Sequence, residues 1–300
     1  MRTLCFGEAL VDLVCERPAG SLAEAHAFTP HLGGVSANVA VAAARAGGDV
    51  ALAGSAGDDL WGAWLRRRLA DEGVGLDWFR LVAGHATSLA FVLLDEQGEA
   101  SYTVHGPAVS PPTKDSKRRL LEALEATDAL CFGSNALGGK AEAALAMAAR
   151  EHALELGRPV VFDANIRLGR WDGNRGRAGA AAGACVPDAF LVKCNVLEGR
   201  LMTGESKPEA AAASLLAAGA QHVIVTLGAR GAILRAKNLR RDVRARDAKV
   251  VSTVGAGDVF TGVLLAALGS TDYYAPAIAA ALPDAAEAAA AACERWGALE

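Results

Sequence analysis

The segment 250-VVSTVGAGDVFTG-262 places a glycine turn, an acid and the start of an apolar helix at one point of the chain. In such a turn Gly255, Ala256 and Gly257 can expose consecutive backbone N–H groups, and a helix that starts there directs its free N–H groups and its dipole at an anion. Asp258 would repel that anion, so its position favours a general base that takes a proton from an attacking hydroxyl. With a reference pKa of about 3.9 it would be ionised at pH 7. The alternative is an aspartate that only caps a helix.

The common nucleotide-binding signatures do not occur in the sequence. A Walker A loop needs GxxxxGK followed by serine or threonine, whereas 133-GSNALGGKA-141 has an extra glycine before Lys140 and alanine after it. A dinucleotide fingerprint needs GxGxxG, but Phe260 stands where the third glycine belongs. HExxH and GxSxG are also missing. The glycine turn therefore belongs to another kind of site.

The composition indicates a globular protein. The 300 residues suit one large α/β domain or two modest ones, with 52% hydrophobic and 21% charged residues. A net charge of −4 without long basic tracts argues against a nucleic-acid partner. The six cysteines are scattered, with no CxxC pair or zinc-ligand set, as is usual in a reducing compartment. Because Glu8 and Asp12 interrupt the first apolar run, and no uncharged run reaches about 20 residues, we expect a cytoplasmic protein without signal peptide or membrane span.

The first third of the chain contains strand-like segments of two kinds. Residues 3–14 predict a first strand, with Gly7 as a bulge or a point of close approach. Residues 87–105 predict a hairpin, because two strand-like runs flank a polar turn. The segment 11–31 lacks helical periodicity, so with the hairpin it predicts a small separate sheet.

Helices and further strands make up the rest. Residues 36–46 predict a helix with Ser36 as its N-cap. Strands are predicted at 129–133, 159–163, 189–193, 222–227 and 231–235. Helices fit between several of these strands, which implies a parallel sheet with right-handed crossovers. The alanine-rich segment 275–296 predicts a helix that is broken near Pro283.

Seven short segments follow the order of the motifs of one known family: 7-GEALVD-12, 33-GGVSANVA-40, 54-GSAGDDLWG-62, 163-DANIR-167, 193-KCNVLEG-199, 226-TLGARGA-232 and 253-TVGAGDVFTG-262. Over nearly the whole chain the sequence resembles the ribokinase-like (PfkB) family of carbohydrate kinases, and within it the bacterial fructokinases. One such motif is weak evidence, but seven in order and at suitable spacing are specific.

The resemblance implies a fold. It is a three-layer, doubly wound α/β domain with a mostly parallel sheet, here a single domain over residues 1–300. A small β-sheet lid, formed by about 12–32 and 87–108, would be inserted in the α/β core and would explain the hairpin. Lid strands of family members often pair between subunits, so the resemblance also makes a homodimer plausible.

For the sugar side the resemblance implies five positions: Asp12, Gly33, Gly34, Asn38 and Arg167. Asp12 and Asn38 would bind sugar hydroxyls, and the two glycines would permit close approach of the backbone. Asparagine is a poor residue for the interior of an alanine-rich helix, which favours a functional role for Asn38. Asp12 could instead simply end a strand, and Arg167 could form a surface ion pair.

For the nucleotide side the resemblance implies a second set of residues. Asn195, Thr226, Gly228 and Gly231 would contact ATP, and Glu198 would hold Mg²⁺ through water. The alternative for Glu198 is an ordinary exposed charge on a helix.

The sequence departs from the family pattern at two places. Ser252 stands where members usually have an aspartate that belongs to a monovalent-cation site. A hydroxyl is a neutral oxygen, whereas hard cations prefer carboxylate and carbonyl ligands, so potassium dependence stays open. The stretch 101-SYTVHGPAVS-110 also lacks the expected pattern of an aromatic and an arginine that fructokinases and ketodeoxygluconate kinases often have there.

The resulting hypothesis is an ATP-dependent sugar kinase. Asp258 would deprotonate a primary hydroxyl, which attacks the γ-phosphoryl group of Mg-ATP in line, while the N–H groups of the glycine turn stabilise the transferring group. The segments 163-DANIRLGRW-171 and 133-GSNAL-137 favour fructose; ketodeoxygluconate and ribose are the rivals. A sensor that binds sugar without phosphoryl transfer is a second hypothesis. A nucleoside kinase would need stacking groups in the lid, and aromatic residues make up only 5% of the chain.

Overall fold

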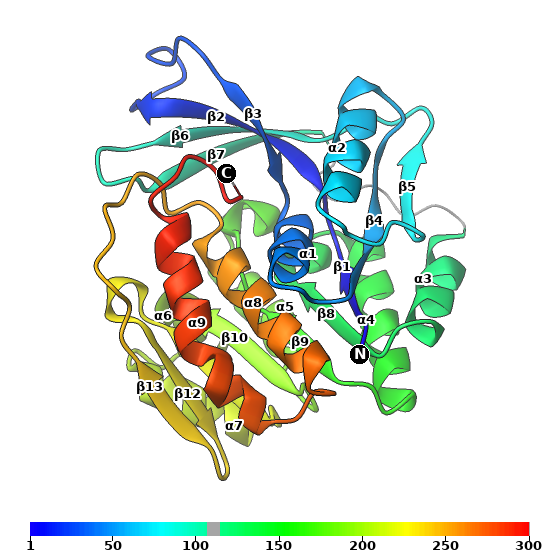
Figure 1. Ribbon diagram of the computed structural model, residues 1–300, viewed down its shortest axis with the longest axis vertical. Helices are drawn as coiled ribbons and strands as arrows, with labels where there is room; N and C mark the ends of the chain where they lie inside the picture. The colour runs from blue at the N-terminus through cyan, green and yellow to red at the C-terminus, as the bar shows by residue number, and fades with distance from the viewer. Residues whose placement is uncertain (107–114, 300) are drawn as a thin grey trace.

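The computed structural model describes residues 1–106 and 115–299 (Figure 1). The centre of this part is a nine-stranded sheet in the order β13 (Arg240–Val243), β12 (Ala232–Ala236), β11 (His222–Thr226), β10 (Leu191–Asn195), β9 (Val160–Asp163), β8 (Ala129–Gly133), β1 (Thr3–Phe6), β4 (Val50–Gly57) and β5 (Phe79–Val82). The pairs from β11 to β5 are parallel, and β12 and β13 add antiparallel strands at one edge. The sheet is therefore mostly parallel, as predicted.

The apolar runs of the sequence correspond to the central strands. Every residue of β1, β8 and β9 is buried, as expected for parallel strands covered on both faces. The five strands predicted after residue 128 are all found, within two residues of their expected ends. Only the short turn η3 (Gly228–Arg230) joins β11 to β12, which explains why this pair is antiparallel.

Helices cover both faces of the sheet and complete three layers. One face carries α1 (Val35–Arg45), α2 (Leu60–Asp71), α8 (Ala256–Ser270) and α9 (Pro276–Ala292), whose apolar residues belong to one core cluster. The other face carries α3 (Ser116–Glu125), α4 (Lys140–Glu155), α5 (Arg175–Gly183), α6 (Val196–Thr203) and α7 (Pro208–Ala217), which belong to a second cluster. In Figure 1, α1, α8 and α9 lie next to one another on the near face. The doubly wound α/β architecture is confirmed.

A second sheet lies across one end of the first (Figure 1). Its order is β3 (Thr29–Gly33), β2 (Leu10–Pro18), β6 (Leu89–Leu94) and β7 (Ala100–His105). The predicted hairpin is the pair β6–β7, and β2 joins it in parallel, so the small separate sheet is confirmed. We call it the lid sheet. Residues 107 and 108 of the expected lid lie outside the described residues.

The predicted single strand over residues 3–14 is wrong. The chain leaves the main sheet after β1 and enters the lid sheet as β2, with Gly7 at the change of direction. Gly7 has φ +151°, and a Cβ on it would lie 2.1 Å from Oγ of Ser36. The close approach expected at this glycine is confirmed, and it separates the apolar run into two strands in different sheets.

The predicted N-cap of α1 is also wrong. The helix starts at Val35 after Gly34, and Ser36 lies inside it, where its hydroxyl donates to the carbonyl oxygen of Phe6 at 3.0 Å. The free N–H of Val35 is instead satisfied by Oε1 of Glu8, at 3.1 Å. The carboxylate of Glu8, from the segment between β1 and β2, therefore caps the helix in place of the local serine.

The predicted break near Pro283 does not occur. Helix α9 continues through it, and Leu282 and Ala285 next to it are fully buried. Proline removes one helical hydrogen bond, but the helix packs along α8 over its length, which offsets that loss. Among the helices of residues 1–106 and 115–299, none combines the length and the apolar character needed to cross a membrane.

Candidate active site

The glycine turn opens α8. Gly255 is the N-cap with φ +73°, and a Cβ on it would lie 2.0 Å from Cβ of Ala298, so both conformation and space require glycine. Among the described residues, the N–H groups of Gly255 and Gly257 have no hydrogen-bond partner, whereas that of Ala256 makes a long bond of 3.5 Å to the oxygen of Thr253. Two of the three N–H groups predicted to face an anion are therefore free at the start of α8, whereas that of Ala256 already has a partner.

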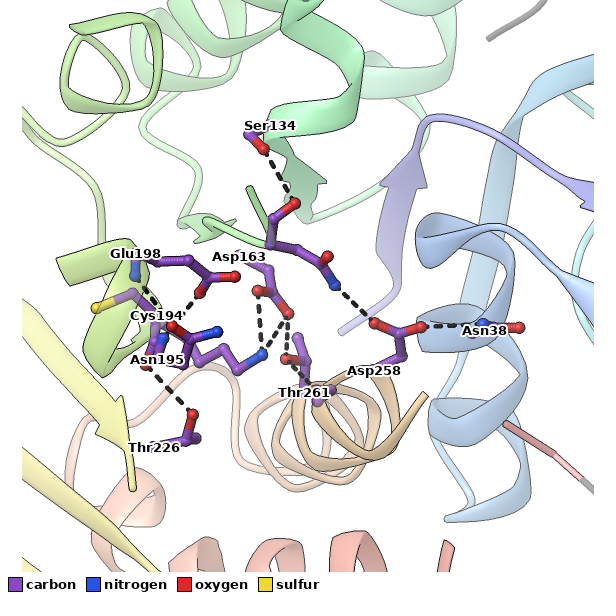
Figure 2. A network of polar contacts seen from close by, with 12 residues as sticks. Asn38, Ser134, Asp163, Cys194, Asn195, Glu198, Thr226, Asp258 and Thr261 are labelled. Carbon is purple, nitrogen blue, oxygen red and sulfur yellow. Dashed lines mark hydrogen bonds and ion pairs between the residues drawn. The ribbon is translucent and has the colours of Figure 1, made fainter. Parts of the chain in front are cut away.

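Asp258 lies in the first turn of this helix with only 3% of its surface exposed. Its two carboxylate oxygens each accept one amide hydrogen bond, from Nδ2 of Asn38 at 2.9 Å and from Nδ2 of Asn165 at 3.0 Å (Figure 2). Asn165 has φ +29°, an unusual value for a residue other than glycine, and its carbonyl oxygen accepts from Ser134 at 3.1 Å. Asn165 stands in the quoted segment 163–167 but was not predicted to act in the site.

The expectation that Asp258 has an ordinary carboxyl pKa is wrong. Burial raises the pKa of Asp258 to about 7. The hydrogen bond from Asn38 lowers the pKa, the charge of Asp163 raises it, and Lys193 and Arg167 lower it. A carboxyl group of this kind exchanges its proton near neutral pH, which suits a general base.

Asp258 faces a cavity of about 600 Å³ between the main sheet and the lid sheet. The predicted residues that line it are Asp12, Gly34, Asn38, Arg167, Gly255 and Asp258. The predicted nucleotide residues Asn195, Thr226, Gly228 and Gly231 do not line it. The structure thus brings six of the predicted sugar and catalytic residues to one cavity, whereas Gly33, Ala256 and Gly257 are not part of its lining.

Asp12 projects into the cavity from the lid strand β2. It is buried, and burial raises its pKa to about 7; the charge of Asp258 adds to this shift and that of Arg167 opposes it. A Cβ on Gly33 would lie 2.4 Å from Cγ of Asp12, so a side chain there would displace the carboxylate. Gly34 has φ +95°, and its Cβ would lie 2.6 Å from the carbonyl oxygen of Glu8. The two glycines therefore make room for Asp12 and for the chain that carries it.

Arg167 lies under the ring of Tyr102, with 5.2 Å between its Cζ and the ring centroid. Tyr102 belongs to lid strand β7 and also lines the cavity. An aromatic and an arginine thus meet here, although the stretch 101–110 does not show the pair by itself; its residues 107–110 lie outside the described residues. The described residues include no ion pair of Arg167, so the alternative of a surface ion pair gains no support.

One wall of the cavity was missed by the sequence interpretation. Oε1 of Glu8 accepts from Nδ2 of Asn135 at 2.8 Å, and burial raises the pKa of Glu8. Arg170 lies in the same wall and pairs with Glu142 at 3.1 Å. Glu8, Asn135 and Arg170 stand in the segments 7–12, 133–137 and 163–171, which were quoted for the family resemblance or for fructose, but none of them was singled out as a site residue.

On the nucleotide side, Asn195 and Glu198 form a capping box at the start of α6. Oδ1 of Asn195 accepts from the N–H of Glu198 at 2.9 Å, and Oε2 of Glu198 accepts from the N–H of Asn195 at 2.8 Å. Oε1 of Glu198 accepts from Ile166 at 3.1 Å. Glu198 is only 8% exposed, so it is not an ordinary exposed charge. Burial raises its pKa, and the charge of Lys193 lowers it.

A magnesium ion fits Glu198 through a bridging water molecule. Each of its oxygens keeps one lone pair beside the backbone hydrogen bond. Within residues 1–106 and 115–299 no group of three or more His, Cys, Asp or Glu side chains could hold a metal. Mg²⁺ usually keeps several waters and takes few protein ligands, so a water-mediated contact with Glu198 suits this donor set.

Ser252 is fully buried, and its hydroxyl accepts from the N–H of Val254 at 3.1 Å. Its backbone N–H donates to the carbonyl oxygen of Cys293. The next residue, Thr253, donates through its N–H to the oxygen of Gly98 at 2.9 Å. The turn of the lid hairpin therefore contacts the segment that leads into the glycine turn.

The second glycine turn follows β11. Thr226 ends this strand opposite Asn195 in β10. Gly228 and Gly231 have φ +61° and +97°, and a Cβ on Gly231 would lie 2.0 Å from the oxygen of Val243. The backbone of this turn therefore needs glycine at Gly231, where both conformation and space exclude a side chain, and favours it at Gly228.

A buried carboxylate at free helix N–H groups, beside a cavity at the ends of parallel strands, is typical of an enzyme that transfers an anionic group to a small molecule. A family model described as pfkB family carbohydrate kinase matches residues 2–300, and the chain belongs to this family. It is a sugar phosphotransferase of an ATP-dependent kinase family.

Known relatives agree with this assignment. Fructokinase-1 of Oryza sativa subsp. japonica is 33% identical over 261 residues, which are 87% of this chain and 80% of the relative. The structure of a fructokinase double mutant from Vibrio cholerae O395 with fructose, ADP and potassium ion is 30% identical, with a TM-score of 0.86 over 99% of this chain and 94% of that one. Aminoimidazole riboside kinase from Salmonella enterica is 27% identical, with a TM-score of 0.82 over 100% and 95%.

Proposed function

We propose that this protein transfers the γ-phosphoryl group of ATP to a primary hydroxyl of fructose. The observation that carries the proposal is the position of Asp258. Its buried carboxyl, with a pKa of about 7, lies between free N–H groups of α8 and the cavity of about 600 Å³. The similarity to fructokinases of rice and Vibrio cholerae supports fructose as the acceptor.

In the proposed reaction, the sugar hydroxyl gives its proton to a carboxylate oxygen of Asp258. The hydroxyl oxygen forms a bond to the γ-phosphorus, the bond from this phosphorus to the β,γ-bridging oxygen breaks, and ADP leaves. The N–H groups of Gly255 and Gly257 are placed to stabilise charge on the transferring group. Among the described residues Oδ1 of Asn38 has no hydrogen-bond partner, so it can accept from a sugar hydroxyl while its Nδ2 holds Asp258.

Charge in the cavity favours a neutral sugar over ketodeoxygluconate. Three carboxyl groups line it, from Glu8, Asp12 and Asp258. Of the two guanidinium groups in the lining, that of Arg170 already pairs with Glu142. An acidic sugar would therefore add a negative charge beside carboxyl groups whose pKa burial already raises, whereas sugar hydroxyls can bond to these groups in either protonation state.

The remaining alternatives fit less well. A nucleoside needs stacking partners, and Tyr102 is the single aromatic residue among the described residues that line the cavity. Ribose fits the same polar groups and is distinguished from fructose by experiment. A sensor has no need for a buried carboxyl group at an anion site, because burying it costs free energy without serving binding.

The nucleotide and cation contacts are part of the same proposal. ATP would bind through Asn195, Thr226, Gly228 and Gly231, and Glu198 would hold Mg²⁺ through water. Mg²⁺ neutralises charge on the phosphate oxygens when it is bound. We also propose that the protein needs no potassium, because the hydroxyl of Ser252 is neutral and already bonded to Val254.

We also propose a cytoplasmic homodimer. All six cysteines are free thiols, which suits a reducing compartment. Strand β7 is the edge of the lid sheet, and its residues from Ser101 to His105 are exposed. An edge strand of this kind can pair with a second copy. Sedimentation of the wild type and of a variant with proline at Thr103 would test this pairing.

The test of the function is ADP release from Mg-ATP in the presence of fructose, ribose, ketodeoxygluconate or aminoimidazole riboside, with sodium or potassium as the only monovalent cation. We expect the highest turnover with fructose and equal rates in the two salts. Turnover on another acceptor alone would replace fructose. Calorimetric binding of a sugar without any ADP release would establish the sensor instead.

A further inference from the structure

A buried ion pair lies beneath the glycine turn and has no part in the reaction described so far. Nζ of Lys193 in β10 lies 3.1 Å from both carboxylate oxygens of Asp163, the last residue of β9 (Figure 2). The two residues face each other across the parallel strands. Their side chains are 5% and 2% exposed, so water solvates neither charge.

The pair is attached to the first turns of α8. The hydroxyl of Thr261 donates to Oδ2 of Asp163 at 2.6 Å (Figure 2). A Cβ on Gly257 would lie 2.9 Å from Nζ of Lys193, so the ammonium group lies directly against the glycine of the anion site. Thr261 is one helical turn beyond Gly257, so both contacts reach the same end of the helix.

Stability alone gives no reason for these charges. Removing an ion pair from water costs about as much as its internal attraction returns, and apolar residues of similar volume are often as stable. The position of the pair supplies a reason, because it lies under the N–H groups and the carboxyl group that carry the proposed reaction.

We propose that Lys193 and Asp163 are positioning residues for phosphoryl transfer: Asp163 holds the start of α8 through Thr261, and the ammonium group of Lys193 offsets negative charge next to Asp258. This inference rests on the proposed role of Asp258 as general base. In this proposal neither Lys193 nor Asp163 contacts the sugar.

The charges around Asp258 decide whether a substitution raises or lowers its pKa. The charged or titratable groups that face it are Asp12 of β2, Tyr102 of β7, Asp163 of β9, Arg167 after β9 and Lys193 of β10. Asp163 raises the pKa of Asp258, while Lys193 lowers it. Burial opposes the charge on Lys193, but Asp163, Glu198 and Asp258 together raise its pKa, so it stays a cation.

The test is the pH profile of kcat/KM for ADP release in two variants that remove one charge each. Lys193→Met should move the acid limb to higher pH by about one pH unit, because Asp258 loses a neighbouring positive charge. Asp163→Asn should move it to lower pH by a similar amount, because Asp258 loses a neighbouring negative charge. Opposite shifts from the two halves of one ion pair are not expected of a merely structural contact, and shifts in one direction, or none, would overturn the proposal.

A matched control is Arg150→Met. Arg150 is also buried, but it donates to the carbonyl oxygen of Pro187 and is not among the charges that act on Asp258. We expect a loss of stability with an unchanged acid limb, and a shift as large as in the other variants would refute the electrostatic argument.

If one single variant does not fold, the double variant Lys193→Met/Asp163→Leu keeps the inference testable, because leucine cannot accept the hydrogen bond from Thr261. Its two charge effects oppose each other, so its acid limb should lie near that of the wild type. Its kcat should fall about tenfold or more with a similar KM for sugar, because the start of α8 loses its anchor. A wild-type kcat would overturn the positioning role. Absence of ADP release from the wild type would contradict the proposed function itself. If the wild type is active but the acid limbs of the single variants lie where that of the wild type lies, only this inference is contradicted.

Discussion

The raised pKa of Asp258 links folding stability to pH, and Asp258→Asn should remove that link. In the folded chain the pKa of this carboxyl group is about 7, against an ordinary value of 3.8. Between these values the folded state binds more protons than the unfolded state. The stabilising contribution is therefore complete below about pH 3.8 and is lost as the pH rises through about 7.

The size of the effect follows from the same values. One pKa unit corresponds to about 1.4 kcal/mol, so the full contribution is about 4 kcal/mol. About 2.6 kcal/mol of it falls between pH 5 and pH 8, where unfolding is readily measured. The group is buried, so solvent screening does not reduce the figure.

Urea unfolding of the wild type and of Asp258→Asn at several pH values from 5 to 8 measures this contribution. The variant also places an amide N–H₂ against the Nδ2 donor of Asn38 or Asn165, which costs stability by a constant amount at every pH. We expect the wild type to lose about 2.6 kcal/mol more than the variant from pH 5 to 8. Parallel stability curves would refute the reasoning. In the same variant, turnover should fall about 10²- to 10⁴-fold, with sugar binding largely kept.

Three further substitutions test the surroundings of the site. Glu198→Gln should raise KM for Mg-ATP roughly 10- to 100-fold in steady-state assays, with an unchanged KM for sugar, because it removes the carboxylate proposed to hold the magnesium hydration shell; an unchanged KM for Mg-ATP would contradict this role. Tyr102→Leu should raise KM for sugar about 2- to 5-fold, the loss of one exposed contact between an aromatic ring and Arg167; a change in kcat alone would argue against it. Ser252→Asp should make turnover higher in potassium than in sodium, and equal rates would show that the serine is not what removes the cation effect.

Much of the architecture could be predicted because its signals are local. The apolar runs at 129–133 and 223–225 are buried parts of the strands β8 and β11, so composition alone indicates them. The hairpin around 87–105 has a polar turn between two strand-like runs. The candidate base also had a local signal, since a glycine turn before an apolar helix is visible in the letters themselves.

The wrong or missing predictions concern residues whose roles depend on partners far away in the sequence. Glu8 caps α1 from 27 residues away, which removed the need for Ser36 as a cap. Asn165 bonds to Asp258 across 93 residues, and Lys193 meets Asp163 across 30. Such pairs exist only once parallel strands are ordered in the sheet, so no spacing in the sequence announces them.

The hydrogen bonds and the burial of Asp258 favour different protonation states. Both carboxylate oxygens accept from amide groups of Asn38 and Asn165, which suits only the ionised form, since a protonated oxygen would face a donor. Burial favours the neutral form and keeps the pKa near 7. A sugar hydroxyl that donates to the carboxylate adds a third hydrogen bond to the charged form and lowers the pKa. Sugar binding would therefore favour the ionised form of Asp258 when the hydroxyl to be deprotonated is in place. Without sugar, the carboxyl group would stay partly protonated and would be a weaker base toward water.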